Sequence, residues 1–222
     1  MANLTQRARE FTLASVLTTY PSAETRELLE GLAGPACAGA LHALLQGAGG
    51  LEDAQSTYCE LFDRGGQRAS LYESEYGRMR GMSKGNTLAD IGGFYQAFGL
   101  TIDQERAHEL VDHIAVELEF YSTLLLKQEL LLRGGNEEGV FVVSDARGKF
   151  LREHLGSLAQ AIAERAEVRA EPSYGPIFTW CAELVAGECR ELEVTPTPLD
   201  FFADESEKGE MKCGAVHLPV VS

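Results

Sequence analysis

Apolar residues recur at helical spacing along most of the chain, and the alternation typical of strands is nearly absent. Within residues 4–20, for example, Leu4, Ala8, Phe11 and Leu17 fall on one face. The same spacing predicts further helices at 22–32, 35–46, 51–62, 87–98, 137–168 with a break near Gly148, and 177–192. The pattern therefore predicts an all-α fold.

The strongest helical pattern runs from about 103 to 132. Its central part, 108–132, would be about 37 Å long at 1.5 Å per residue, and its apolar positions extend more than halfway around. We therefore expect a single helical-bundle-like domain over 1–194, built around this long central helix. N-terminal and C-terminal lobes of the domain would meet near 100–112.

A glycine-rich connection at about 63–86 interrupts the helical pattern. Its five glycines disfavour a continuous helix, and long ordered loops in compact domains are often functional. At the other end of the sequence, 195–222 forms an acidic segment that we expect to be a mobile tail. The glycine-rich connection permits a homodimer by domain exchange, without requiring one.

The charge of the chain limits its partners. There are 19 Lys and Arg against 34 Asp and Glu, a net charge of −15. Such a field repels nucleic-acid phosphates and anionic lipids, so we expect neither nucleic-acid binding nor stable membrane association. A cationic partner is favoured instead.

The cysteine pattern and the absence of common catalytic motifs narrow the functional class of the protein further. Five Cys, an odd number without any CxxC, favour a reducing, cytoplasmic location, and no apolar run approaches the 18 residues of a membrane span. Phosphate-loop, dinucleotide, HExxH and GxSxG motifs are absent. We expect no enzyme activity, no catalytic residues, no cofactor and no metal ligands; the alternative is a small metal-dependent hydrolase using His113 and Glu117 with His108.

Three segments stand out as candidate binding sites. Ser70-Leu-Tyr-Glu-Ser-Glu-Tyr76 places aromatic faces beside carboxylates, which suits an apolar peptide carrying a basic residue. At 112–117, His113 and Glu117 are four residues apart on the predicted helix, and a carboxylate there would favour a protonated imidazole. The third segment, 77–85, is cationic and could contact an anion. The alternatives are that the tyrosines plug the core, that the 112–117 residues brace the interior, and that the cations pair with carboxylates of the chain itself.

Four segments, taken in their order along the chain, resemble the TorD/DmsD/NarJ family of redox-enzyme maturation chaperones, also called the nitrate reductase delta-subunit family. The matching sequences are Tyr58-Cys-Glu-Leu-Phe62, Ser70-Leu-Tyr-Glu-Ser-Glu-Tyr76, Tyr95-Gln-Ala-Phe-Gly-Leu100 and Asp112-His-Ile-Ala-Val-Glu-Leu-Glu-Phe120. Together they cover about 58–132. The sequence departs from the family pattern where Leu110-Val111 precedes the Asp-His pair and where Ser70-Leu-Tyr72 precedes the Glu-Ser.

The resemblance implies an all-α chaperone that binds the precursor of the catalytic subunit of a molybdopterin-guanine-dinucleotide enzyme of the dimethyl-sulfoxide-reductase type. It implies contact with the signal segment or the enzyme core, help with cofactor insertion, and delay of export until folding is complete. The expected client-binding residues are Tyr72, Glu73, Ser74, Tyr76, Asp112, His113 and Glu117. A weaker expectation is anion or nucleotide contact by Arg78, Arg80 and Lys84. A permanent adaptor subunit of the redox enzyme is the remaining alternative.

Overall fold

The structure is a computed structural model that describes residues 3–32, 50–63, 69–76, 84–100 and 109–199. Every named element within these ranges is helical, which confirms the predicted all-α class. The helices are α1 (Leu4–Thr18), α2 (Ala23–Leu32), α4 (Gly50–Tyr58), α5 (Lys84–Ala97), α6 (Ile114–Arg133), α7 (Glu137–Phe150), α8 (Gly156–Glu164), α9 (Ala166–Ala170) and α10 (Tyr174–Glu191). Three short turns complete the list: the π turns η1 (Cys59–Asp63) and η3 (Leu151–Leu155), and the 3-10 turn η2 (Glu73–Glu75). The helix predicted at 35–46 lies outside the described residues.

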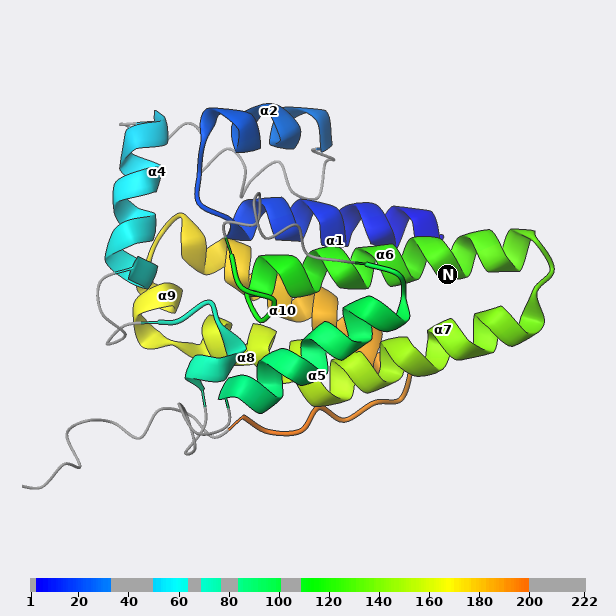
Figure 1. Ribbon diagram of the computed structural model, residues 1–222. Helices are drawn as coiled ribbons and strands as arrows, with labels where there is room; N and C mark the ends of the chain where they lie inside the picture. The colour runs from blue at the N-terminus through cyan, green and yellow to red at the C-terminus, as the bar shows by residue number, and fades with distance from the viewer. Residues whose placement is uncertain (1–2, 33–49, 64–68, 77–83, 101–108, 200–222) are drawn as a thin grey trace, which may run out of the picture.

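Helix α6 lies at the centre of the molecule. It runs alongside α1, and α7 returns along it after a tight turn, while α10 packs behind α1 and against α8 (Figure 1). Leu118, Tyr121, Leu124 and Leu125 of α6 are all fully buried. The expected long central helix is therefore present. Its wide apolar face packs against partners on several sides.

Side-chain caps set several of the helix starts that the sequence predicts. The Asn3 side chain accepts a hydrogen bond from the backbone N–H of Thr5, and Asn136 accepts one from Gly139. Ser22, a predicted cap, accepts from the backbone N–H of Thr25, whose hydroxyl accepts in return from the Ser22 N–H. These bonds satisfy backbone donors that have no partner inside the helix.

The start of the central helix was predicted too early. The structure places 109–113 in a turn, and α6 begins only at Ile114, while 101–108 lie outside the described residues. Leu110 and Val111 continue the apolar spacing and so extend the helical pattern in the sequence. The ring of His113 accepts the backbone N–H of Ala115 and thereby caps the helix, so Asp112 and His113 precede it.

The break predicted near Gly148 lies slightly later in the chain, at the π turn η3, which begins at Leu151. Helix α7 passes through this glycine, which is buried and whose missing Cβ would lie 3.5 Å from the Val194 side chain. A Cβ at this distance would make an ordinary van der Waals contact, so the segment after α10 packs beside Gly148 without requiring a glycine there. The regular helix is interrupted by η3 and again at Arg165.

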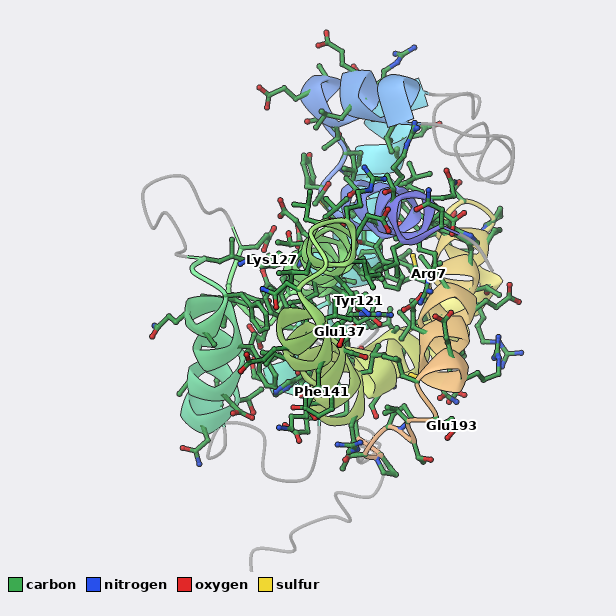
Figure 2. The ribbon with its side chains drawn as sticks, turned by 90° about the vertical axis from the view of Figure 1, so that its right-hand side faces the viewer. Arg7, Tyr121, Lys127, Glu137, Phe141 and Glu193 are labelled. Carbon is green, nitrogen blue, oxygen red and sulfur yellow. The ribbon has the colours of Figure 1, made fainter. Side chains whose placement is uncertain are left out.

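A buried ionic cluster joins four of the helices. Glu188 of α10 accepts hydrogen bonds from Arg7 of α1 at 2.6 Å and Tyr121 of α6 at 2.7 Å, and it pairs with Arg147 of α7 at 2.5 Å. Figure 2 shows Arg7 and Tyr121 in this central region. Burial alone would raise the pKa of Glu188, but the hydrogen bonds and the two guanidinium charges lower it below its usual value. The cluster fixes how α1, α6, α7 and α10 pack.

The described start of the acidic C-terminal segment packs against the domain. The backbone N–H of Thr197 donates to the carbonyl of Arg152 at 2.7 Å, and the Ser157 hydroxyl donates to the carbonyl of Thr197. Residues 200–222 lie outside the described residues.

Candidate functional site

The glycine-rich connection meets the start of α6 through a short backbone pairing. Tyr72 and His113 form an isolated antiparallel bridge. The N–H of Glu73 donates to the carbonyl of Asp112, and the N–H of Ile114 donates to the carbonyl of Leu71, both at 2.9 Å. The structure thus brings together the two segments that the sequence analysis selected. We call 69–76 with 109–114 the bridge region.

The side chain of Asp112 holds the glycine-rich connection against the start of α6. Its Oδ2 accepts the backbone N–H of Ser74 at 3.0 Å, at the start of the turn η2. Asp112 is fully buried, and neither its Oδ1 nor the Ser74 hydroxyl has a hydrogen-bond partner among the described residues. An unpaired buried polar atom is costly, so these two atoms mark a place where the fold tolerates a penalty.

His113 is a neutral capping residue in this structure. Its Nδ1 accepts the N–H of Ala115 at 3.1 Å and so carries no proton. Burial lowers the pKa of His113 to about 4. The expectation that Glu117 favours a protonated imidazole is therefore wrong, because the ring is desolvated and its nearest acid is Glu109, at 4.0 Å from Nε2.

Glu117 lies inside the core with two other acids close by. It is fully buried, and neither carboxyl oxygen makes a hydrogen bond to another described residue. Burial and the charges of Glu73 and Asp112 raise its pKa well above the usual value. Glu117 therefore keeps its proton to a higher pH than an exposed glutamate does.

Tyrosines attach the bridge region to the core. The Tyr76 hydroxyl donates to the carbonyl of Ser70 at 2.6 Å, and the Tyr95 hydroxyl of α5 donates to the carbonyl of Val111 at 2.8 Å. Tyr76 is buried, as the alternative interpretation of a core-filling tyrosine predicts. Tyr76 therefore anchors the bridge region to the core.

Tyr72 has a different environment, at the surface edge of the bridge region. Its hydroxyl donates to the carboxylate of Glu109, and its ring packs edge-on against His113 with centroids 5.0 Å apart. Tyr72 and Glu109 are only half-buried, and the neighbouring Leu110 is 47% exposed. Sequence analysis missed Glu109, because only the pairing of two segments 37 residues apart identifies it.

Of the seven residues predicted to bind the client, the structure leaves only Tyr72 partly open to solvent. The other six are buried: Glu73, Ser74, Tyr76, Asp112, His113 and Glu117. Five of them belong to the bridge region and Glu117 lies one turn into α6, and the surface beside them includes Tyr72, Glu109 and Leu110. Whether any of the seven contacts a client stays a prediction.

The cationic segment is described only at its end. Lys84 begins α5 and pairs with Glu75 at 3.1 Å, as expected if its charge is used within the chain. Arg78 and Arg80 lie outside the described residues, so the predicted anion contact stays untested.

Glu73 has a partner that the sequence did not suggest. One of its oxygens lies 3.1 Å from Nδ1 of His154, a buried residue of η3 that is 81 positions away. Burial would lower the pKa of His154, but Glu73 and then Asp90 raise it above its usual value. No local pattern in the sequence connects these two side chains.

The arrangement at the bridge region does not resemble the hydrolase considered above. Nδ1 of His113 is used by the backbone, and within the described ranges neither His113 nor Glu117 belongs to a group of three possible metal ligands. His108 is outside those ranges. A search of the same residues finds no helix long and apolar enough to cross a bilayer.

Comparison with known proteins supports the resemblance. A family model described as nitrate reductase delta subunit matches residues 23–164. The "Selenate reductase assembly chaperone protein" of Thauera selenatis is 29% identical over 129 residues, which cover 56% of this chain and 64% of that protein. "Chaperone protein TorD" of Vibrio vulnificus strain YJ016 is 27% identical over 159 residues, covering 68% of this chain and 72% of the relative. The chain thus spans less than two thirds of the selenate reductase relative. Because the family model covers more than half of the chain, including the whole bridge region, the chain belongs to the nitrate reductase delta subunit family.

Proposed function

We propose that this protein is a maturation chaperone for the catalytic subunit of a dimethyl-sulfoxide-reductase-type molybdenum enzyme. It would bind the cofactor-free precursor, assist insertion of the molybdenum cofactor and delay export until folding is complete. Family membership supports this proposal, as do two similar proteins whose names describe chaperones, one of them for assembly of selenate reductase. A cytoplasmic location and the absence of a catalytic role belong to the same proposal.

The Tyr72–Glu109 pair beside exposed Leu110 is the observation that supports a contact surface for the precursor. A carboxylate, an aromatic face and an exposed leucine lie next to each other at the edge of the bridge region. This combination suits a peptide in which a basic residue adjoins an apolar segment, because the acid pairs with the cation while the apolar groups supply contact area. The twin-arginine signal segment of an exported precursor has this chemistry.

Charged, apolar and buried groups would make different contributions to binding at this surface. The net charge of −15 would speed the encounter with a cationic segment, and apolar contact would supply most of the affinity. Asp112, His113 and Glu73 would act as positioning residues, since they hold the backbone of Tyr72 and its neighbours from the buried side.

A peptide titration tests the contact surface. The probe is a synthetic peptide with an Arg-Arg pair followed by a leucine-rich segment, measured by fluorescence anisotropy. Glu109→Gln removes the charge at the surface edge, and we expect Kd to rise about tenfold, equivalent to about 1.4 kcal/mol for a partly exposed ionic contact. The exposed Glu119→Gln on α6 is the matched control and should leave Kd within a factor of two.

Salt dependence supplies a second readout of the same contact. Binding of the peptide should weaken as salt is raised but should not disappear, because screening acts on the charges and not on the apolar contact. Equal affinities for wild type and Glu109→Gln, or an affinity indifferent to salt, would remove Glu109 from the contact surface.

A further inference from the structure

A pocket between α5 and the π turn η3 holds a second group of ionisable side chains. It has a volume of about 630 Å³, and its walls include Asp90 of α5, Glu153 and His154 of η3, and Glu73. The pocket lies outside the surface of Tyr72, Glu109 and Leu110. Two of its acids, Asp90 and Glu153, are exposed, whereas His154 is only 4% exposed.

His154 is oriented as metal-binding histidines are. Its Nδ1 faces the Glu73 carboxylate at 3.1 Å, and its Nε2, which is buried, makes no hydrogen bond to any described residue. Histidines that bind a metal through one nitrogen commonly donate the other N–H to a carboxylate, which fixes the tautomer and the ring orientation. Glu73 fills that role for His154 and leaves Nε2 as the free ligand atom.

The distance from Nε2 to Asp90 matches the separation of two ligands of one metal ion, and Glu153 lies nearby. Oδ2 of Asp90 lies 3.3 Å from Nε2 without a hydrogen bond between them, so the carboxylate is off the axis of the ring nitrogen. Two ligands at 2.0–2.1 Å from a tetrahedral zinc ion are separated by about 3.3–3.4 Å. One ligand atom each from Asp90, Glu153 and His154 all fall within 4.8 Å of one another. The exposed Glu153 side chain can close the remaining gap by a change of rotamer.

We propose that Asp90, Glu153 and His154 bind one divalent transition-metal ion of the zinc type. One imidazole with two carboxylates suits Zn²⁺, Co²⁺ or Mn²⁺ better than Mg²⁺ or Ca²⁺, which prefer oxygen ligands alone, and better than Cu⁺, which prefers sulfur. Three protein ligands leave a coordination position for water. The site does not require the chaperone function proposed above, although it shares Glu73 with the bridge region.

Binding would tie separate parts of the chain together. Asp90 belongs to the helix that follows the glycine-rich connection, Glu153 and His154 to the π turn, and Glu73 to the bridge region. An interruption of regular helix by a π turn is frequent at functional sites. The ion would therefore link α5 to the segment that joins α7 and α8, with Glu73 orienting the histidine.

The test is a titration of the full-length chain with Co²⁺, followed by displacement with Zn²⁺. Cobalt is the probe because its visible absorption distinguishes nitrogen and oxygen ligands from thiolates, and the chain has five Cys. We expect one Co²⁺ to bind without a thiolate charge-transfer band and to be displaced by Zn²⁺.

Variants at the two exposed ligands keep the fold and report on the site. Asp90→Asn and Glu153→Gln should each raise Kd for Co²⁺ at least about tenfold, because even the loss of a residue that only hydrogen-bonds to a metal ligand costs about 10-fold to 100-fold in affinity. Asp53→Asn, an exposed aspartate on α4, is the matched control and should leave Kd within a factor of two. The proposal is overturned by a thiolate band, by no saturable binding up to about 1 mM, or by an unchanged Kd in Asp90→Asn with a wild-type circular dichroism spectrum.

Discussion

Replacing Glu117 by Gln should make the protein more stable, by an amount that grows with pH. The wild-type carboxyl is fully buried, has no hydrogen bond to a described residue and lies near the charges of Glu73 and Asp112. These conditions raise its pKa, so the folded protein keeps the proton to a higher pH than the unfolded chain does. Gln has nearly the same shape as the protonated acid and keeps a donor, but it binds no proton.

The size of the effect follows from proton linkage. In the unfolded chain this carboxyl loses its proton above about pH 4.3, whereas the folded state keeps it until its raised pKa is reached. Since the folded state binds more protons in this window, the stability contribution is present at low pH and is lost as pH rises. The loss is about 1.4 kcal/mol for each pH unit between about 4.3 and the raised pKa of the folded state.

Urea unfolding followed by circular dichroism at pH 6, 7 and 8 measures this difference. Other groups that titrate in the range, such as His154, are present in both proteins and cancel when the two free energies of unfolding are subtracted. The exposed Glu119→Gln on the same helix should give a curve parallel to wild type. A difference between Glu117→Gln and wild type that stays constant with pH would refute a pKa of Glu117 raised well above its usual value.

Three further predictions concern single positions. Gly156→Ala should destabilise by at least about 1–3 kcal/mol, because a Cβ there would lie 2.2 Å from a backbone carbonyl, whereas Gly85→Ala, with open space around it, should be neutral or stabilising; thermal unfolding separates the two. In urea unfolding, Glu188→Gln should cost about 3–5 kcal/mol, since it removes the buried carboxylate that pairs with both Arg7 and Arg147 and leaves Arg147 without an acidic partner, while the half-exposed Glu191→Gln should cost less than about 1 kcal/mol. For His113, the pKa is lowered to about 4 when folded, so the unfolded chain binds more protons between about pH 4 and 6.5; wild type should lose about 3 kcal/mol as pH falls through this window, and His113→Asn, which can still cap the helix, should not.

The sequence predicted those parts of the fold whose signals are local. The stripe in α1 and the cap at Ser22 can be recognised within a few residues, and the structure confirms both. Gly148 carries the same local signal as a helix break, yet it lies inside α7, buried beside the segment that follows α10. Glycine can end a helix or lie within one, and the neighbouring sequence alone does not distinguish the two cases.

The candidate site divides in the same way. The sequence selected 70–76 and 112–117, and the backbone pairing of Tyr72 with His113 shows that these segments do meet. It could not show that most of the selected side chains point inward, since burial depends on the whole bundle. Nor could it find Glu109 beside Tyr72 or His154 beside Glu73, because these contacts join positions far apart in the chain.

Purification of the tagged protein from its native host tests the central claim most directly. Proteins that copurify are identified by mass spectrometry and assayed for molybdenum and molybdopterin, with Glu109→Gln and Glu119→Gln purified in parallel. We expect to recover an unprocessed molybdoenzyme precursor without its cofactor, in lower yield with Glu109→Gln than with the control. Recovery of the mature, cofactor-loaded enzyme would instead identify a permanent subunit, and recovery of no molybdoenzyme would contradict the proposed function.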